Sequence, residues 1–144
     1  EKYKVYTDSG RTESNIDTFD WIKEVQDMGV GEIILTSINN EGTGKGFDLN
    51  LYEKASKICN ISLLAHGGTR NSDDIYKLFI STDIDGAIIA SAFHFNYYKE
   101  LLNKKKIPLR GSTNFLFNQD FKNIFFFGVK DLKKYLKSKN ISIR

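Results

Sequence analysis

The sequence predicts an α/β protein in which short parallel strands alternate with helices. Three short apolar runs lie at residues 32–36, 61–65 and 86–90, and apolar residues at helical spacing follow each of them. Runs that are apolar on both faces favour strands buried in a parallel sheet, and the alternation favours repeated β/α units. Such units fit an open sheet or part of a closed barrel.

The first part of the chain predicts a strand, a turn and a helix. Residues 2–7 alternate as strand residues do, and residues 9–10 have the composition of a turn. Asp17 or Thr18 is the expected N-cap of the following helix, and Gly29 is expected to end it.

Four further helices are expected along the rest of the chain. Helical spacing covers residues 49–59 and 72–81, with Ser72 as the N-cap of the second. Ser91 is expected to begin another helix directly after the third strand, and residues 131–137 form the last one.

The composition is that of a globular domain of ordinary size. The chain has 144 residues, of which 40% are hydrophobic and 27% are charged. This is too short for a complete eight-stranded β/α barrel, which needs roughly 250 residues. The single Cys59 excludes a disulfide framework and a zinc site made of cysteines. With no long apolar run, these features predict a cytoplasmic protein without a membrane segment.

Charge is distributed unevenly along the chain. Residues 1–98 carry 9 Lys/Arg and 15 Asp/Glu, whereas residues 99–144 carry 12 and 3. A basic region of this kind is compatible with nucleic-acid binding. The lysines are not interleaved with a known motif, so we interpret them as solvated helix faces and do not expect nucleic-acid binding.

Small residues follow two neighbouring predicted strands. Gly67 and Gly68 allow backbone N–H groups to approach an anion closely. Ala90 and Ser91 begin a helix, whose amino end favours a phosphate. Because the carboxyl ends of parallel strands meet at one edge, the two loops together predict a phosphate site, although a plain tight turn remains an alternative for each.

Four side chains are candidates for chemistry or packing. Glu41, in the glycine-rich loop 37–48, is the candidate general acid or base, the alternative being an exposed loop carboxylate. Thr36 ends its strand and is expected to face a pocket. His66 is a possible base or anion contact, whereas His94 is expected to pack between two phenylalanines. No His, Asp or Glu cluster has the spacing of metal ligands, so no metal site is predicted.

Several motifs in the same chain order resemble the cyclase subunit of imidazole glycerol phosphate synthase. The motifs are Tyr6-Thr7-Asp8-Ser9-Gly10, Gly31-Glu32-Ile33-Ile34-Leu35-Thr36-Ser37, Glu41-Gly42-Thr43 with Gly46-Phe47-Asp48, Ala65-His66-Gly67-Gly68, Ala87-Ile88-Ile89-Ala90-Ser91-Ala92-Phe93-His94-Phe95, and, near the end, Leu132-Lys133-Lys134-Tyr135-Leu136 with Ile141-Ser142-Ile143-Arg144. The resemblance covers residues 1–95 and 129–144.

This resemblance implies a partial (β/α)8 TIM barrel, roughly strands six to eight of its C-terminal half. Members of the family are lyases without a cofactor that take ammonia from a glutamine amidotransferase (glutaminase) partner. They convert a phosphorylated ribosyl substrate into imidazole glycerol phosphate and AICAR in histidine biosynthesis. Both catalytic aspartates of the family belong to strands outside this chain. The residues that carry over to the substrate and phosphate site are Thr36, Gly42, Thr43, Gly67, Gly68, Ala90 and Ser91.

The sequence also departs from the family pattern. Asn39 and Glu41 stand where the family has aspartates, and His66 replaces a serine. The resemblance divides the chain into β/α units at 1–95, a basic, Phe-rich insertion at 96–128 and the last barrel helix with the C-terminus at 129–144.

Two other functions remain open at this point. One is a cyclase-like paralog that acts with an amidotransferase to form an acetamidino group on surface sugars. The other is a non-catalytic, phosphate-binding half-barrel that pairs with the missing N-terminal half or with a second copy of itself to cover its open edge.

Overall fold

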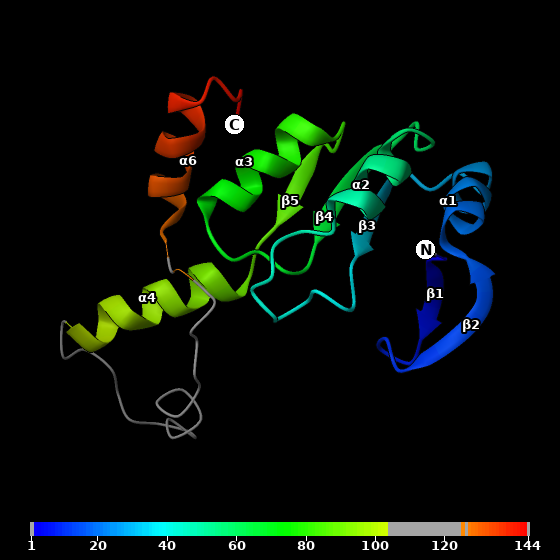
Figure 1. Cartoon of the computed structure of the whole chain (residues 1–144), viewed down its shortest axis with the longest axis horizontal. Coiled ribbons are helices and arrows are strands. Elements are labelled where there is room, and N and C mark those ends of the chain that lie inside the picture. The colour runs from blue at the N-terminus through cyan, green and yellow to red at the C-terminus, as the bar shows by residue number, and fades with distance from the viewer. Residues whose placement is uncertain (1, 104–124, 126, 144) are drawn as a thin grey trace.

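A computed structural model of the protein describes residues 2–103, 125 and 127–143, which form two sheets and their flanking helices (Figure 1). β1 (Lys4–Thr7) and β2 (Thr12–Asp17) make an antiparallel hairpin. β3 (Glu32–Thr36), β4 (Ser62–His66) and β5 (Gly86–Ile88) form a parallel sheet in sequence order. The helices are α1 (Thr18–Asp27), α2 (Leu49–Ser56), α3 (Ser72–Ser81), α4 (Ser91–Asn103) and α6 (Val129–Ser138).

The α/β prediction with a parallel sheet is confirmed. β3 spans the predicted residues, β4 lies one residue later than predicted, and β5 ends two residues earlier. The register pairs Thr36 with His66 and His66 with Ile88. The three strands therefore end side by side, which brings the loops that follow them to one edge of the sheet.

The start of α1 agrees with its sequence pattern. The carboxylate of Asp17 accepts hydrogen bonds from the backbone N–H groups of Phe19 and Asp20, so Asp17 is the N-cap. Gly29 follows the helix with φ +87°, a conformation that glycine adopts without steric cost.

The start of α3 corrects one prediction. Asn71, not Ser72, is the N-cap: its side chain accepts the N–H of Asp74 at 3.0 Å, and the Asp74 carboxylate accepts the N–H of Asn71 at 3.2 Å. This reciprocal pair satisfies two N–H groups that a helix start otherwise leaves unpaired, which favours Asn71 over its neighbour.

α2 ends three residues before the predicted end. The backbone N–H groups of Ile58 and Cys59 both donate to the carbonyl of Ala55, so the chain turns tightly there instead of continuing the helix. The helical spacing of Ile58 reflects packing against the core, not helical backbone.

Helices cover one face of the parallel sheet. Leu63 and Ala65 on β4 are 1% and 0% exposed, and Leu35 and Ala87 on the neighbouring strands pack on the same side. We call these four residues the covered face. Figure 1 shows α2 and α3 lying on one side of the sheet. The buried helix residues packed there are Leu51, Tyr52, Ala55, Ile75, Leu78, Leu132 and Leu136.

The opposite face of the sheet corrects the prediction that the apolar strands are buried on both sides. Ile34, Leu64 and Ile88 alternate with the covered residues and therefore point the other way. Ile34 is 56% exposed, and Leu64 and Ile88 are half-buried. We call these three residues the open face. They are apolar although no helix of the described residues covers them.

The outer strands of the sheet are β3 and β5, and in the described residues neither pairs with a further strand. A groove of about 800 Å³ lies beside β5, lined among others by Phe79, Ile89, Phe93, Leu132 and Ile143. α6 packs against α3, where the Tyr135 hydroxyl donates to Asp73 at 3.1 Å.

The C-terminal part is described only in part. α4 runs without a break across position 96, and residues 104–124 of the expected insertion lie outside the described residues. His94 on α4 is exposed, and its ring contacts Phe95 edge-on at 5.2 Å, so the predicted packing between two phenylalanines is found with one of them. Of the helices within the described ranges, none has the length and apolar character of a membrane span.

Candidate functional site

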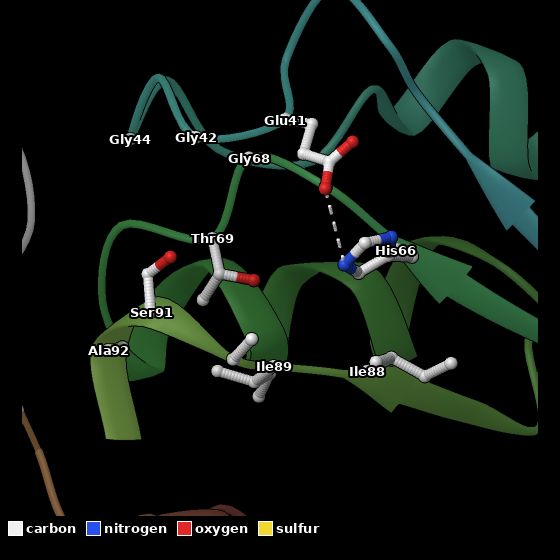
Figure 2. A pocket seen from close by; sticks show the side chains of 12 residues that line it. Glu41, Gly42, Gly44, His66, Gly68, Thr69, Ile88, Ile89, Ser91 and Ala92 are labelled. Carbon is white, nitrogen blue, oxygen red and sulfur yellow. Dashed lines mark ion pairs between the residues drawn. The ribbon is translucent and has the colours of Figure 1, made fainter. Parts of the chain in front are cut away.

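A small pocket of about 110 Å³ lies at the carboxyl edge of the parallel sheet (Figure 2). Its walls come from the loop after β3, the loop after β4, and the junction of β5 with α4. The lining residues are Glu41, Gly42, Gly44, His66, Gly67, Gly68, Thr69, Ile88, Ile89, Ala90, Ser91 and Ala92. Parallel α/β sheets bind their ligands at this edge.

The glycine turn after β4 requires residues without a side chain. Gly67 and Gly68 have φ values of +102° and +96°. A Cβ atom on Gly67 would lie 2.9 Å from the Ser37 carbonyl oxygen, and one on Gly68 would overlap the Gly46 carbonyl. The Gly46 N–H donates to the Gly68 carbonyl at 2.7 Å. The loops after β3 and β4 are therefore held together directly by their backbones.

The loop after β3 is braced by its own polar side chains. Asn40 donates from its side chain to the Gly46 carbonyl at 3.0 Å, and the Thr43 hydroxyl donates to the Asn40 carbonyl at 2.7 Å. Thr43 therefore supports the loop without lining the pocket. Gly42, with φ +71° and no atom within 4 Å of a Cβ position, forms part of the pocket wall.

α4 presents its amino end to the pocket. The His94 N–H donates to the Ala90 carbonyl at 2.9 Å, which is the first hydrogen bond of the helix. The N–H groups of Ser91 and Ala92, both lining residues, precede that bond and so have no carbonyl within the helix. Together with the helix dipole, these N–H groups favour a negatively charged ligand.

Three polar side chains meet at the mouth of the pocket. Thr36 Oγ1 lies 3.1 Å from His66 Nδ1, and His66 Nε2 lies 3.9 Å from a carboxylate oxygen of Glu41. The histidine side chain is 24% exposed and the glutamate 52%. Figure 2 shows the ring and the carboxylate pointing toward one another, with Thr69 and Ser91 on the opposite side of the pocket.

Tyr52 holds the strand ends from beneath. This α2 residue is fully buried, and its hydroxyl contacts the backbone carbonyls of His66 and Leu35. Burial, which disfavours the phenolate, raises the pKa of Tyr52 well above its ordinary value. The hydroxyl therefore remains a hydrogen-bond donor that fixes the carboxyl ends of β3 and β4.

The structure brings together most of the residues predicted from the sequence. Glu41, Gly42, Gly67, Gly68, Ala90, Ser91 and His66 line the pocket, and Thr36 contacts His66. Sequence reasoning did not select Gly44, Thr69, Ile88, Ile89 and Ala92, which also line it. Thr69 directly follows the glycine pair, and this position in the loop after β4 is the sequence feature that could have identified it as a lining residue. In the described ranges, no group of three His, Cys, Asp or Glu side chains is arranged to hold a metal ion.

Comparison with known proteins identifies one family and relatives that share one name. The family model described as histidine biosynthesis protein matches residues 1–99. The subunit HisF of imidazole glycerol phosphate synthase from Bacillus cereus (strain Q1) is 41% identical over 95 residues, covering 66% of this chain and 38% of the relative.

Two further relatives carry the same name. The protein from Prochlorococcus marinus (strain MIT 9301) is 36% identical over 115 residues, which cover 76% of this chain and 45% of the relative. The protein from Methanosarcina mazei is 39% identical over 113 residues, covering 75% and 41%. The chain thus spans about two fifths of the length of the curated relatives that it matches.

Proposed function

Because this chain belongs to the histidine biosynthesis protein family, we propose that it is the C-terminal part of a cyclase subunit of imidazole glycerol phosphate synthase. In this proposal the whole protein is a lyase that receives ammonia from a glutamine amidotransferase. It converts a phosphorylated ribosyl intermediate into imidazole glycerol phosphate and AICAR. The names of the relatives and the order of the motifs support this proposal.

The observation that carries the proposal is the pocket at the carboxyl edge of the sheet, which we assign to a phosphate group of the substrate. The turn at Gly67 and Gly68 and the amino end of α4 at Ser91 both face this pocket. Backbone N–H groups supply directed hydrogen bonds to phosphate oxygens, and glycines let the ligand approach the backbone closely. Gly42 and Ala90 complete the wall, Thr43 braces the loop, and Thr36 orients a side chain at its mouth.

Glu41 is the residue of this chain that we propose for acid–base chemistry. It lies at the rim of the pocket, half exposed, with its carboxylate directed toward His66. This position allows it to exchange a proton with a substrate whose phosphate occupies the pocket. The two main catalytic aspartates of the family belong to strands that this chain does not contain.

We further propose that an N-terminal β/α half completes the barrel. The open face, the two outer strands and the groove beside β5 are surfaces that such a half would cover. The relatives are more than twice as long as the matched region, which is consistent with that arrangement. Residues 1–95 and 129–144 then supply barrel units, and 96–128 form an insertion, of which 104–124 and 126 lie outside the described residues. Cys59, a free thiol, is consistent with our placing the protein in the cytoplasm.

The phosphate assignment is tested by ligand protection. Inorganic phosphate is expected to raise the melting temperature of the wild type, because a ligand that binds only the folded state stabilises it. Gly68→Asp places a carboxylate against the anion and should abolish that shift. Since Gly68→Asp also collides with the Gly46 carbonyl, Gly42→Asp provides a second variant: nothing lies within 4 Å of its Cβ position.

Gly29→Asp is the matched control for the second variant. Gly29 also has a positive φ and an open Cβ position, but it follows α1, away from the pocket. Gly42→Asp and Gly29→Asp each place a side chain at a positive φ, and only Gly42→Asp is expected to lose protection by phosphate. Equal protection of the wild type, Gly42→Asp and Gly29→Asp by phosphate would show that the site is misplaced.

Catalysis is tested by comparing the chain with the whole protein. The full-length protein should release AICAR from the phosphoribosyl intermediate in the presence of ammonium ions. The 144 residues alone should show no turnover, because the family's aspartates are missing. Turnover by the isolated chain would contradict the assignment of the missing half. A stable homodimer of the isolated chain that lacks turnover would favour the non-catalytic alternative.

A further inference from the structure

The charges around the pocket do not match those of an ordinary anion site. Among the described residues that line it, none is a lysine or an arginine. Glu41 and His66 are the lining residues with titratable side chains, and Glu41 brings a carboxylate to the rim. A phosphoryl group in this pocket would meet a carboxylate at the rim, which disfavours binding unless a positive charge is supplied.

His66 is placed to supply that charge. Its Nδ1 is held by Thr36 Oγ1 at 3.1 Å, which leaves Nε2 on the side of the pocket (Figure 2). Nε2 lies 3.9 Å from the Glu41 carboxylate, a distance that is an ion pair when the imidazole is protonated. The ring is partly shielded, with 24% of the side chain exposed, so solvent screens this charge less than it would a surface residue.

The neighbours of the His66 ring on β5, α2 and β3 are uncharged, so Glu41 and the ligand are the groups that influence its protonation. β5 contributes Ile88, which is apolar and pairs with His66 in register. α2 contributes Tyr52, whose hydroxyl contacts the backbone carbonyl of His66 and not the ring, and whose raised pKa keeps it neutral. β3 contributes Thr36, which does not titrate in the relevant range.

We propose that His66 is an anion-binding residue that takes up a proton when a phosphoryl group enters the pocket. The imidazolium then offsets the charge of Glu41 and donates from Nε2 toward the anion. This inference rests on the proposed phosphate site and adds to it the residue that makes binding depend on pH. By thermodynamic linkage, protonation strengthens anion binding and the bound anion strengthens protonation by the same factor.

The direct test uses sulfate, whose charge does not change between about pH 5.5 and about pH 8, where histidine titrates. Binding of sulfate to the full-length protein that carries this chain is measured by calorimetry across that range. The association constant of the wild type should fall by about tenfold as pH rises, the change that corresponds to roughly 1.4 kcal/mol. In buffers of different ionisation enthalpy, binding near neutral pH should show proton uptake.

Two variants test whether His66 is the residue that makes anion binding depend on pH. His66→Gln keeps a polar side chain that does not titrate and should make sulfate binding weak and independent of pH. His94→Gln removes the other histidine of the chain, which is exposed on α4 and does not line the pocket, and should keep the wild-type profile. In NMR of the full-length protein labelled at histidine, with resonances assigned from these two variants, sulfate should cause His66 to take up a proton at higher pH than without sulfate and should leave the His94 resonance unchanged.

Glu41→Gln tests the opposing charge. Removing the carboxylate should strengthen sulfate binding severalfold at about pH 8, where an ordinary histidine is neutral. It should also shift the pH dependence to lower pH, because the imidazolium loses its partner.

The outcomes distinguish the two proposals. Sulfate and inorganic phosphate that fail to bind the wild type at any pH would refute the proposed phosphate site. Binding that is independent of pH in the wild type, or that keeps its pH dependence in His66→Gln, would refute the role of His66 alone. Loss of the pH dependence in His94→Gln would assign the titrating group to α4 and would also overturn it.

Discussion

The covered and open faces of the β3–β4–β5 sheet use the same kinds of side chain but meet different surroundings. Leu63 on the covered face is 1% exposed, whereas Ile34 on the open face, one strand away, is 56% exposed. Apolar composition therefore identifies these residues as strand formers without revealing what covers them. The difference lies in the helices, which pack on one side of the sheet, and substitutions on the two faces and in their supporting helices test it.

The largest expected effect comes from Leu63→Ala on the covered face. Removing this buried side chain should lower the free energy of unfolding by about 2–5 kcal/mol, because it leaves a cavity among α2, α3 and the sheet. The measurement is chemical denaturation of the 144-residue chain.

Leu64→Ala is the matched control, since it is the same change one residue along the strand. Leu64 is only half-buried, so its loss should cost clearly less in the isolated chain. In the full-length protein its cost should approach that of Leu63→Ala if an N-terminal half covers the open face. Equal costs in the isolated chain would contradict the distinction between the faces.

Tyr52→Phe tests how the covered face supports the pocket. The hydroxyl contacts the carbonyls of Leu35 and His66, and its removal should cost about 1–2 kcal/mol by leaving buried carbonyls without their donor.

The same variant should change the response to alkali. An ordinary tyrosine ionises near pH 10, and because the folded pKa of Tyr52 is raised, the unfolded chain releases this proton first. The stability that Tyr52 contributes is therefore present below pH 10 and is lost as the pH rises above it, by about 1.4 kcal/mol per pH unit. Above pH 10, the free energy of unfolding of Tyr52→Phe should fall less steeply with pH than that of the wild type. Parallel profiles would show that Tyr52 does not cause this loss of stability.

Asn71→Ala weakens one of the helices that make the covered face. Loss of the reciprocal hydrogen bonds with Asp74 should cost about 1 kcal/mol of unfolding free energy. Ser72→Ala, at the position that the sequence pattern suggested as the cap, should have a smaller effect. A larger loss for Ser72→Ala would contradict the assignment of the cap.

The smallest effect is expected for Ile34→Thr on the open face. This residue is more than half exposed, so the change should stay within about 0.5 kcal/mol in the isolated chain. The change keeps a β-branched residue and so preserves the preference for a strand. A greater loss would show that the open face is covered in the isolated chain, for instance by a second copy.

Sequence patterns predicted the order and type of the elements well because these depend on neighbouring residues. The strand at residues 32–36 and the cap at Asp17 follow from local spacing and local hydrogen bonds. The cap of α3 was misplaced by one residue, since Asn71 and Ser72 are both good caps and only the bond to Asp74 separates them. The exposure of Ile34 depends on which elements pack against the sheet, and a strand sequence does not contain that information.

In the pocket, too, features set by neighbouring residues were predictable and contacts between distant residues were not. Gly67, Gly68 and Ser91 were identifiable because glycine pairs and helix starts have recognisable patterns after strands. The contact of His66 with Glu41 was not identifiable, because it joins the end of β4 to a loop residue 25 positions earlier in the sequence. Such contacts follow from the register of the sheet, which sets Thr36 beside His66.

The sequence order of β3, β4 and β5 within their sheet has a consequence for how the chain folds. Each strand pairs with the strand that comes next along the polypeptide, and a single crossover helix separates them. No pairing in this sheet has to wait for a distant segment, so loop-closure entropy stays small and folding should be fast for a parallel sheet. During synthesis on the ribosome, the pairing partners emerge in the order in which the sheet uses them, one β/α unit at a time.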